Sequence, residues 1–240
     1  MSRRGNFLAG AKYLTEGFRL ITHPRLRLFI LIPALINLVF FIIFTTLFIQ
    51  RFDSLLNYMM DWLPGFLEFL AWVVGILIAL FILLIYGYSF SAFTNLLAAP
   101  FYGVLAERTE DLITGQTPDS ESLAQLIPRT VFRELTKFWY FLWRSLLILI
   151  LTFIPPIGPI IGAVWGMWCM SIQYGDYAAD NNKISFSELR WRLRSKLLTA
   201  MGFGGAVMLG MMIPIVNIIV MPAAVIGGTL FWMQELRSIE

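Results

Sequence analysis

Apolar residues gather in four long blocks, and polar or charged segments separate them. Two blocks, 28–50 and 66–99, run without a break, and each exceeds the roughly 20 residues that a membrane-spanning helix needs. We therefore predict a first span at 28–50 and a longer second span at 66–99, joined by an interfacial loop near 51–65. The mostly polar residues 106–137 are predicted to form an extramembrane segment with a turn between helical stretches.

Prolines interrupt the other two blocks, 138–174 and 197–232. The interruptions read "FIPPIGPIIG" from Phe153 and "MIPIVNIIVMP" from Met212. Proline removes a helical hydrogen bond and clashes with the preceding turn, so neither block is expected to be one straight helix. Each block forms either a pair of short spans or a helical hairpin that enters the membrane part-way. We favour partial hairpins, because irregular backbone in a membrane is tolerated only where protein or water surrounds it.

The composition indicates the class of protein. Hydrophobic residues make up 58% of the 240 positions and charged residues only 14%, against about 45–50% and about 25% in soluble domains. We predict an all-α integral membrane protein, with 1–240 as a single membrane domain. Its two long transmembrane helices and two proline-broken hairpins are expected to carry cytoplasmic helical extensions.

Basic residues flank the apolar blocks, where they set membrane orientation. Six precede the first block: Arg3, Arg4, Lys12, Arg19, Arg25 and Arg27. Others lie in 106–137 and in a second polar segment, 175–196, whereas only Arg51 follows the first block. If both hairpins return to the side they entered, the three basic segments share one side, and the positive-inside rule places them and both termini in the cytoplasm. This distribution argues for membrane topology and against nucleic acid as a partner, despite the formal charge of +3.

The stretch "THPRLRLF" at the start of the first block is a candidate anion site. Pro24 suits the first turn of a helix, and the backbone N–H groups of Arg25, Leu26 and Arg27 would then be free helix-start donors. Guanidinium groups match the oxygens of a tetrahedral oxyanion by paired N–H donors. The alternative is that these arginines only orient the helix and bind lipid headgroups.

Polar residues near the other blocks are candidates for a transport pathway. Asp176 and Asp180, spaced i and i+4, share a helix face and are candidates for a cation site, proton coupling or pairing with arginines; the alternative is that they cap a membrane helix. Tyr88, Ser91 and Asn95 form a polar stripe that faces either a pore or a neighbouring helix. Glu107 and Arg108 are candidates for a charged vestibule.

Other parts of the chain carry little chemistry of their own. Arg144 lies inside an apolar block and needs an acidic partner, water or lipid headgroups. Ser185 and Glu188 form a capping box at the start of a basic helix that is expected to lie along the membrane surface. With one histidine and one cysteine, and without a phosphate-binding glycine loop, we expect no enzyme activity, no metal and no cofactor.

Four separated stretches resemble the bacterial CysZ sulfate transporters: "HPRLRLFILIPALIN", "NLLAAPFYGVLAE", "IQYGDYAADNNKISF" and "IPIVNIIVMPAAVIGGT". The resemblance covers nearly the whole chain. It implies sulfate uptake across the bacterial inner membrane for cysteine biosynthesis, by two long helices and two partial hairpins in a homo-oligomer. It also implies a sulfate-binding loop at Pro24, Arg25, Leu26 and Arg27, where Arg25 replaces the glycine usual in the family.

These observations lead to two hypotheses. The first is passive or proton-coupled sulfate transport, in which membrane lipids and further copies of the chain are the other partners. The second is a membrane scaffold or regulator that transports nothing and binds an anionic partner or lipid headgroups. A less favoured third, an enzyme acting on lipid phosphates through Asp176 and Asp180, would need metal-dependent turnover.

Overall fold

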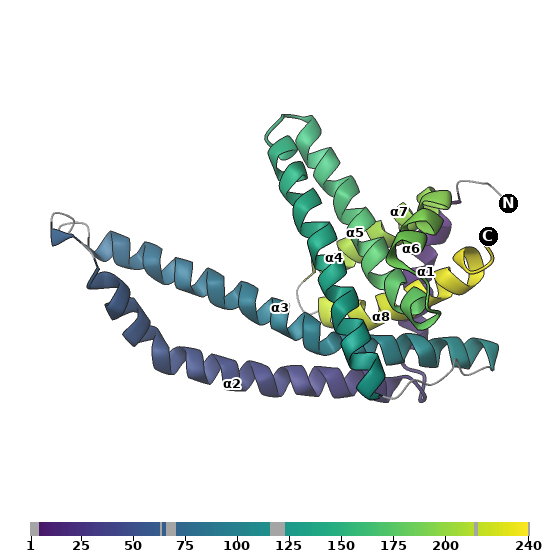
Figure 1. The fold of residues 1–240 in the computed structure, drawn as a ribbon, viewed down its shortest axis with the longest axis horizontal. Helices are drawn as coiled ribbons and strands as arrows, with labels where there is room; N and C mark the ends of the chain where they lie inside the picture. The colour runs from purple at the N-terminus through teal and green to yellow at the C-terminus, as the bar shows by residue number, and fades with distance from the viewer. Residues whose placement is uncertain (1–4, 63, 66–70, 116–122, 214–215, 240) are drawn as a thin grey trace. The chain divides into compact units, whose positions relative to one another are not determined.

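The computed structural model describes residues 5–62, 64–65, 71–115, 123–213 and 216–239, and for some helical residues it describes only the backbone. The described part is helical, without a strand, which confirms the prediction of an all-α protein. The elements, shown in Figure 1, are α1 (Phe7–Leu20), α2 (Arg27–Met60), α3 (Ala71–Thr114), α4 (Leu123–Thr152), α5 (Ile157–Asn181), α6 (Phe186–Ser195), α7 (Leu197–Met211), α8 (Val216–Phe231) and the π-helix η2 (Trp232–Leu236).

The chain divides into two compact units. We call residues 32–98 the hairpin unit, and residues 1–31 with 99–240 the core unit. In the hairpin unit, α2 and α3 pair through a hydrogen bond of 2.8 Å between the Thr45 and Tyr86 hydroxyls and through stacking of Phe48 on Tyr86. Their apolar side chains point outward, and none of the residues 38–60 is buried.

The first long helix does not end at the predicted loop. Helix α2 continues to Met60, so the interpretation of 51–60 as part of a loop is wrong. The stretch "RFDSLLNYMM" contains neither glycine nor proline, and its charged residues, Arg51 and Asp53, do not interrupt a helix.

The apolar block that precedes Pro100 also continues as helix, because α3 runs through Pro100 to Thr114. A proline inside a helix costs about 3 kcal/mol. Burial of the following turns, at Leu105, Ala106, Thr109 and Glu110, offsets that cost.

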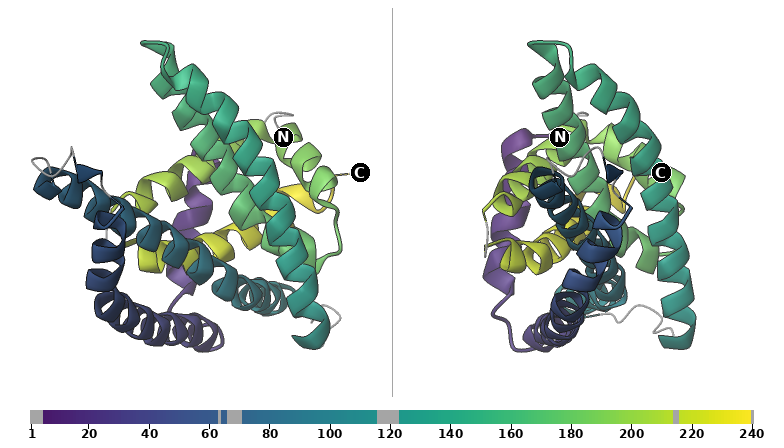
Figure 2. Two further views of the ribbon diagram at one scale, coloured as in Figure 1. Left: turned by 60° about the vertical axis from the view of Figure 1, so that its left-hand side comes forward. Right: turned by 90° about the vertical axis from the view of Figure 1, so that its left-hand side faces the viewer.

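Helix α8 lies at the centre of the core unit, against α1, α5 and α7 (Figure 2). Its residues 223–231 are all buried. Glycines bring the helix axes close: a Cβ on Gly17 of α1 would overlap the Ala223 carbonyl of α8, and a Cβ on Gly10 would overlap the Thr199 carbonyl of α7. Small residues at such crossings are typical of helix packing in membranes.

Both broken blocks are helix pairs. Helices α4 and α5 meet at residues 153–156 and lie side by side (Figure 1). Helix α7 ends at Met211 and α8 begins at Val216, so the second break is shorter than the sequence suggested and Pro222 lies inside α8. The 15 residues of α7 rise about 22 Å, less than the roughly 30 Å of a bilayer core.

Three described helical stretches are long and apolar enough to cross a membrane: Leu38–Met60, Ile127–Thr152 and Ile219–Leu236. The first exposes its apolar side chains, whereas most of the third is buried inside the core unit. Apolar surface of this extent is stable in lipid rather than in water. The protein is therefore an all-α integral membrane protein.

Candidate functional site

The predicted anion-binding stretch forms a tight turn immediately before α2. Pro24, Arg25 and Arg27 are exposed, and Leu26 between them is completely buried in the core. The burial of Leu26 fixes the turn and leaves both arginine side chains on the surface. Helix α2 begins at Arg27, three residues later than a first-turn position for Pro24 would require.

The backbone donors of this turn are already used. His23 accepts all three: its Nδ1 from the Arg25 N–H at 3.3 Å, and its carbonyl from the Leu26 and Arg27 N–H groups at 2.9 and 3.2 Å. The expectation of free helix-start donors is therefore wrong for these three amides, because the histidine before the proline caps the turn. Any anion held here must be held by the guanidinium groups.

Arg108 adds a third guanidinium near the start of α2. Its Cζ lies 5.7 Å from the centroid of the Phe29 ring, two residues beyond Arg27. Within the described residues, Arg25, Arg27 and Arg108 form no ion pair with a carboxylate. We call these three residues the unpaired arginines. Glu107, predicted beside Arg108, is half-buried on the same turn of α3.

Asp176 and Asp180 lie on one face of α5, as predicted, and meet a row of cations on α4. The Nη2 and Nε atoms of Arg133 donate to Asp176 Oδ1 at 2.6 and 3.0 Å. The Lys137 ammonium, which is 1% exposed, lies 3.2 Å from Asp176 Oδ2 and 2.6 Å from Glu134. We call Arg129, Arg133, Glu134, Lys137, Asp176 and Asp180 the paired cluster; its three cations and three carboxylates balance.

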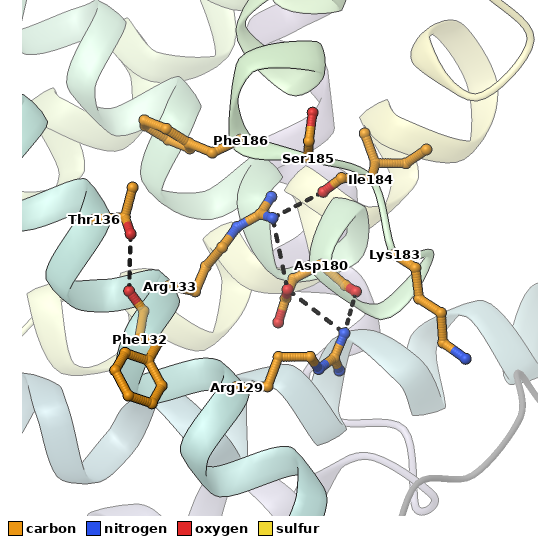
Figure 3. Close-up of a pocket in the computed structure, with 9 residues that line it drawn as sticks. All are labelled: Arg129, Phe132, Arg133, Thr136, Asp180, Lys183, Ile184, Ser185 and Phe186. Carbon is orange, nitrogen blue, oxygen red and sulfur yellow. Dashed lines mark hydrogen bonds and ion pairs between the residues drawn. The ribbon is translucent and has the colours of Figure 1, made fainter.

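Asp180 occupies the more solvent-exposed end of the paired cluster, and Figure 3 shows it beside Arg129 and Arg133. Its Oδ1 lies 3.5 Å from Arg129 Nη1 and 3.7 Å from Arg133 Nη1. An open pocket of about 460 Å³ adjoins it and is lined by Arg129, Phe132, Arg133, Thr136, Asp180, Lys183, Ile184, Ser185 and Phe186. Burial raises the pKa of Asp180 above its usual range, and the nearby Arg129 and Arg133 partly oppose this.

The chain turns sharply between α5 and α6, and this turn forms the rim of the pocket. Lys183 adopts a left-handed backbone with φ of 58°. The N–H of Ile184 donates to the Ala179 carbonyl and the N–H of Lys183 to the Asp180 carbonyl, both at 2.9 Å, which is a Schellman helix end. Ser185 then caps α6 by accepting from the Glu188 N–H at 3.2 Å, as the capping-box pattern predicted.

The predicted polar stripe on α3 is not tested by the structure. The side chains of Tyr88, Ser91 and Asn95 lie outside the described residues. Among the described residues, no group of three His, Cys, Asp or Glu side chains is placed to hold a metal ion. Pairing with arginines, one of the roles predicted for Asp176 and Asp180, is confirmed. The sequence analysis did not name the partners, although Arg129, Arg133 and Lys137 repeat every four residues and match the spacing of the two aspartates.

Comparison with known proteins places the chain among relatives. The family model described as "Sulfate transporter CysZ/Etoposide-induced protein 2.4" matches residues 13–222. The chain belongs to this family. The sulfate transporter CysZ of Pseudomonas aeruginosa PAO1 is 43% identical over 235 residues, which cover 95% of this chain and 96% of the relative. Those of Pseudomonas fluorescens Pf0-1 and Pectobacterium atrosepticum are 42% and 38% identical, over 95% and 97% of this chain and 94% and 87% of the relatives.

Proposed function

We propose that this protein carries sulfate across the bacterial inner membrane and so supplies sulfate assimilation and cysteine biosynthesis. The observation that carries the proposal is the near full-length similarity to proteins named sulfate transporter, at 43% identity. The exposed apolar helices of the hairpin unit support a place in the membrane. The proposal further includes cytoplasmic termini, part-way entry of the two hairpins and assembly as a homo-oligomer.

The unpaired arginines are the proposed site of first contact with sulfate. Arg25 and Arg27 project from a turn that the buried Leu26 anchors, and Arg108 of α3 lies over the ring of Phe29, two residues beyond Arg27. Guanidinium groups bind a tetrahedral dianion through charge-assisted N–H bonds. Because these groups are exposed to water, binding is weak enough for the ion to be released, as a conducting pathway requires. Pro24, also exposed, holds the turn open and donates no hydrogen bond of its own.

The two aspartates have different proposed roles. Asp176 is nearly inaccessible and binds two cations, so it is proposed to hold α4 against α5. Asp180 borders the open pocket and is the better candidate for exchanging protons with water if transport is proton-coupled. Glu107 and the polar stripe of Tyr88, Ser91 and Asn95 are proposed to line the pathway.

The test is uptake of radiolabelled sulfate into liposomes that contain the purified full chain. We expect uptake above that of empty liposomes, and a loss of about tenfold for Arg27→Ala at low sulfate concentration, since a charge-assisted hydrogen bond contributes about 1.5–3 kcal/mol. The matched control is Arg194→Ala, which removes an exposed arginine from α6. An imposed pH gradient, applied to wild type and to Asp180→Asn, tests proton coupling.

Two outcomes would count against this proposal. If wild-type liposomes take up no more sulfate than empty ones, the protein is not a sufficient transporter and a scaffold role is favoured. If Arg27→Ala and Arg194→Ala lower uptake equally, general positive charge rather than the unpaired arginines attracts sulfate.

A further inference from the structure

Two guanidinium groups from different helices contact the ring of Tyr140 in the core unit. The Cζ atom of Arg144, on α4, lies 3.9 Å from the ring centroid, and that of Arg190, on α6, lies 4.7 Å from it. The ring itself is held firmly. Its hydroxyl accepts a hydrogen bond of 3.2 Å from Trp168 Nε1, and Phe186 packs edge-on at 5.3 Å.

No carboxylate of the described chain balances these two charges. Within the part of the chain that the structure describes, Arg144 donates only to the Tyr140 carbonyl, at 3.4 Å, and Arg190 only to the Phe186 carbonyl, at 3.3 Å. Arg192, two residues further along α6, instead pairs with Glu188 at 2.8 Å. The two positive charges repel each other, and an anion bound to both guanidinium groups would offset that repulsion by attracting each of them.

The surroundings indicate where such an anion comes from. Arg144 lies in Ile127–Thr152, a stretch long and apolar enough to cross a membrane. Near Arg144 and Arg190 in sequence, Trp139, Trp143 and Trp191 expose 54%, 62% and 48% of their surface. Exposed tryptophans collect at the membrane–water interface, at the level of the lipid headgroups. An arginine at that level reaches lipid phosphates directly.

We propose that Arg144 and Arg190 bind a tetrahedral oxyanion beside Tyr140, and that its source is the phosphate of an anionic membrane lipid. The paired N–H donors of a guanidinium fit two phosphate oxygens at once, and stacking on Tyr140 and Phe186 orients both forks. The site is distinct from the unpaired arginines, which lie at the start of α2 and on α3. It ties α4 and α6 to the headgroup layer and stands whether or not the protein transports sulfate.

The experiment measures lipid retained by the full chain in detergent, by native mass spectrometry. Purified protein receives phosphatidylglycerol or phosphatidylcholine with the same acyl chains. Wild type is expected to retain more phosphatidylglycerol, and Arg144→Gln and Arg190→Gln to lose about fivefold in its affinity each, as one arginine near an anionic surface contributes about 1 kcal/mol. The matched control, Arg194→Gln, removes the same charge from α6 and is expected to keep the preference.

A second arm separates the two sources of the oxyanion. The thermal unfolding temperature is measured in phosphatidylcholine with sulfate, inorganic phosphate or chloride at constant ionic strength. A rise with sulfate or phosphate that Arg144→Gln and Arg190→Gln abolish, without any preference for phosphatidylglycerol, keeps the oxyanion site but assigns it to a free ion. Arg144→Lys with Arg190→Lys retains both charges and is expected to lose part of the binding, because the planar forks are gone.

The proposal is overturned if neither lipid nor free ion shows binding that depends on these two arginines. It is equally overturned if Arg194→Gln loses as much phosphatidylglycerol as the site variants, since attraction would then be a property of the whole basic surface. Helical circular dichroism and size-exclusion profiles establish that each variant is folded. If the glutamine variants do not fold, the paired lysine variant decides the question: unchanged lipid retention there excludes recognition by guanidinium forks.

Discussion

The paired cluster and the unpaired arginines each contain three cationic side chains, yet they differ in every other respect. In the paired cluster, Glu134, Asp176 and Asp180 match the cations, and Lys137 is 1% exposed. Among the unpaired arginines, Arg25, Arg27 and Arg108 are exposed, and no described carboxylate pairs with them. In the paired cluster, carboxylates of the protein neutralise the cations, whereas the unpaired arginines remain available to bind an anionic ligand.

The comparison shows that location decides what an arginine does in this protein. Taking a charge out of water costs several kcal/mol, so buried cations are found only with carboxylates or other partners. An exposed arginine carries no such cost and can remain without a partner until an anion arrives. The sequence distance between cation and carboxylate is no guide, since Arg133 and Asp176 are 43 positions apart.

The largest effect is expected when the paired cluster is made to resemble the unpaired arginines. Asp176→Asn leaves Arg133 and the buried Lys137 without their shared carboxylate, and breaking such a buried pair costs about 3–5 kcal/mol. We expect a lower thermal unfolding temperature in detergent and a lower yield of folded protein. The double variant Asp176→Asn with Lys137→Met also removes the buried ammonium, which would otherwise keep Glu134 as its one partner in the cluster, and should recover part of the loss. A single variant as stable as wild type would mean that the cluster does not hold α4 to α5.

How far the sequence predicts this structure depends on the range of the interactions involved. The apolar runs and the prolines at 155–156 and 214 predict the helices and the breaks, because both act locally. The predicted loop at 51–65 begins too early, because no residue in 51–60 interrupts a helix and α2 continues to Met60.

The site was harder to predict because its contacts are either distant in sequence or unusually local. Pairing between α4 and α5 depends on which helix faces meet, and no single segment carries that information. The hydrogen bonds from three backbone N–H groups to His23 are instead local, and they depend on turn geometry that residue types alone do not predict. Arg25 and Arg27, which the sequence favours as anion ligands, are exposed, and their role in binding stays a prediction.

A second experiment makes the unpaired arginines resemble the paired cluster. Arg108→Glu places a carboxylate near the start of α2, where it can compete with sulfate for Arg25 and Arg27. We expect sulfate uptake by liposomes to fall further than in Arg108→Gln, by a factor corresponding to about 1.5–3 kcal/mol for a charge-assisted bond. Because Arg108 is exposed, the unfolding free energy should change by less than about 0.5 kcal/mol. Equal uptake by the Glu and Gln variants would exclude Arg108 from the anion site.

A third and smaller effect is expected at Asp180, at the more solvent-exposed end of the paired cluster. The raised pKa of Asp180 means that the folded protein holds its proton more tightly than the unfolded chain does. The stabilisation from this carboxyl is therefore fully present below the ordinary aspartate range and is lost as pH rises through the raised pKa. Asparagine does not titrate. The unfolding temperature of wild type minus that of Asp180→Asn should accordingly be higher near pH ~4 than near pH ~7.

The opposite trend in that difference would have a clear meaning. If wild type gained on Asp180→Asn as pH rose, the ion pairs with Arg129 and Arg133 would outweigh burial. Asp180 would then behave like Asp176, and it would be a poor candidate for proton coupling.

The smallest effect is expected at Lys183, on the rim of the pocket. Substitutions there test whether its charge is needed or whether the residue only occupies a strained, left-handed backbone position. Its φ of 58° lies in the left-handed region, where glycine has no steric penalty and where Schellman ends usually place it. Lys183→Gly should raise the unfolding free energy by about 0.5–1 kcal/mol, since it relieves that strain. Lys183→Ala removes the same charge but keeps the Cβ, so it separates the two explanations. If glycine stabilises and alanine does not, backbone strain decides the outcome; if both destabilise equally, the ammonium contributes to the paired cluster.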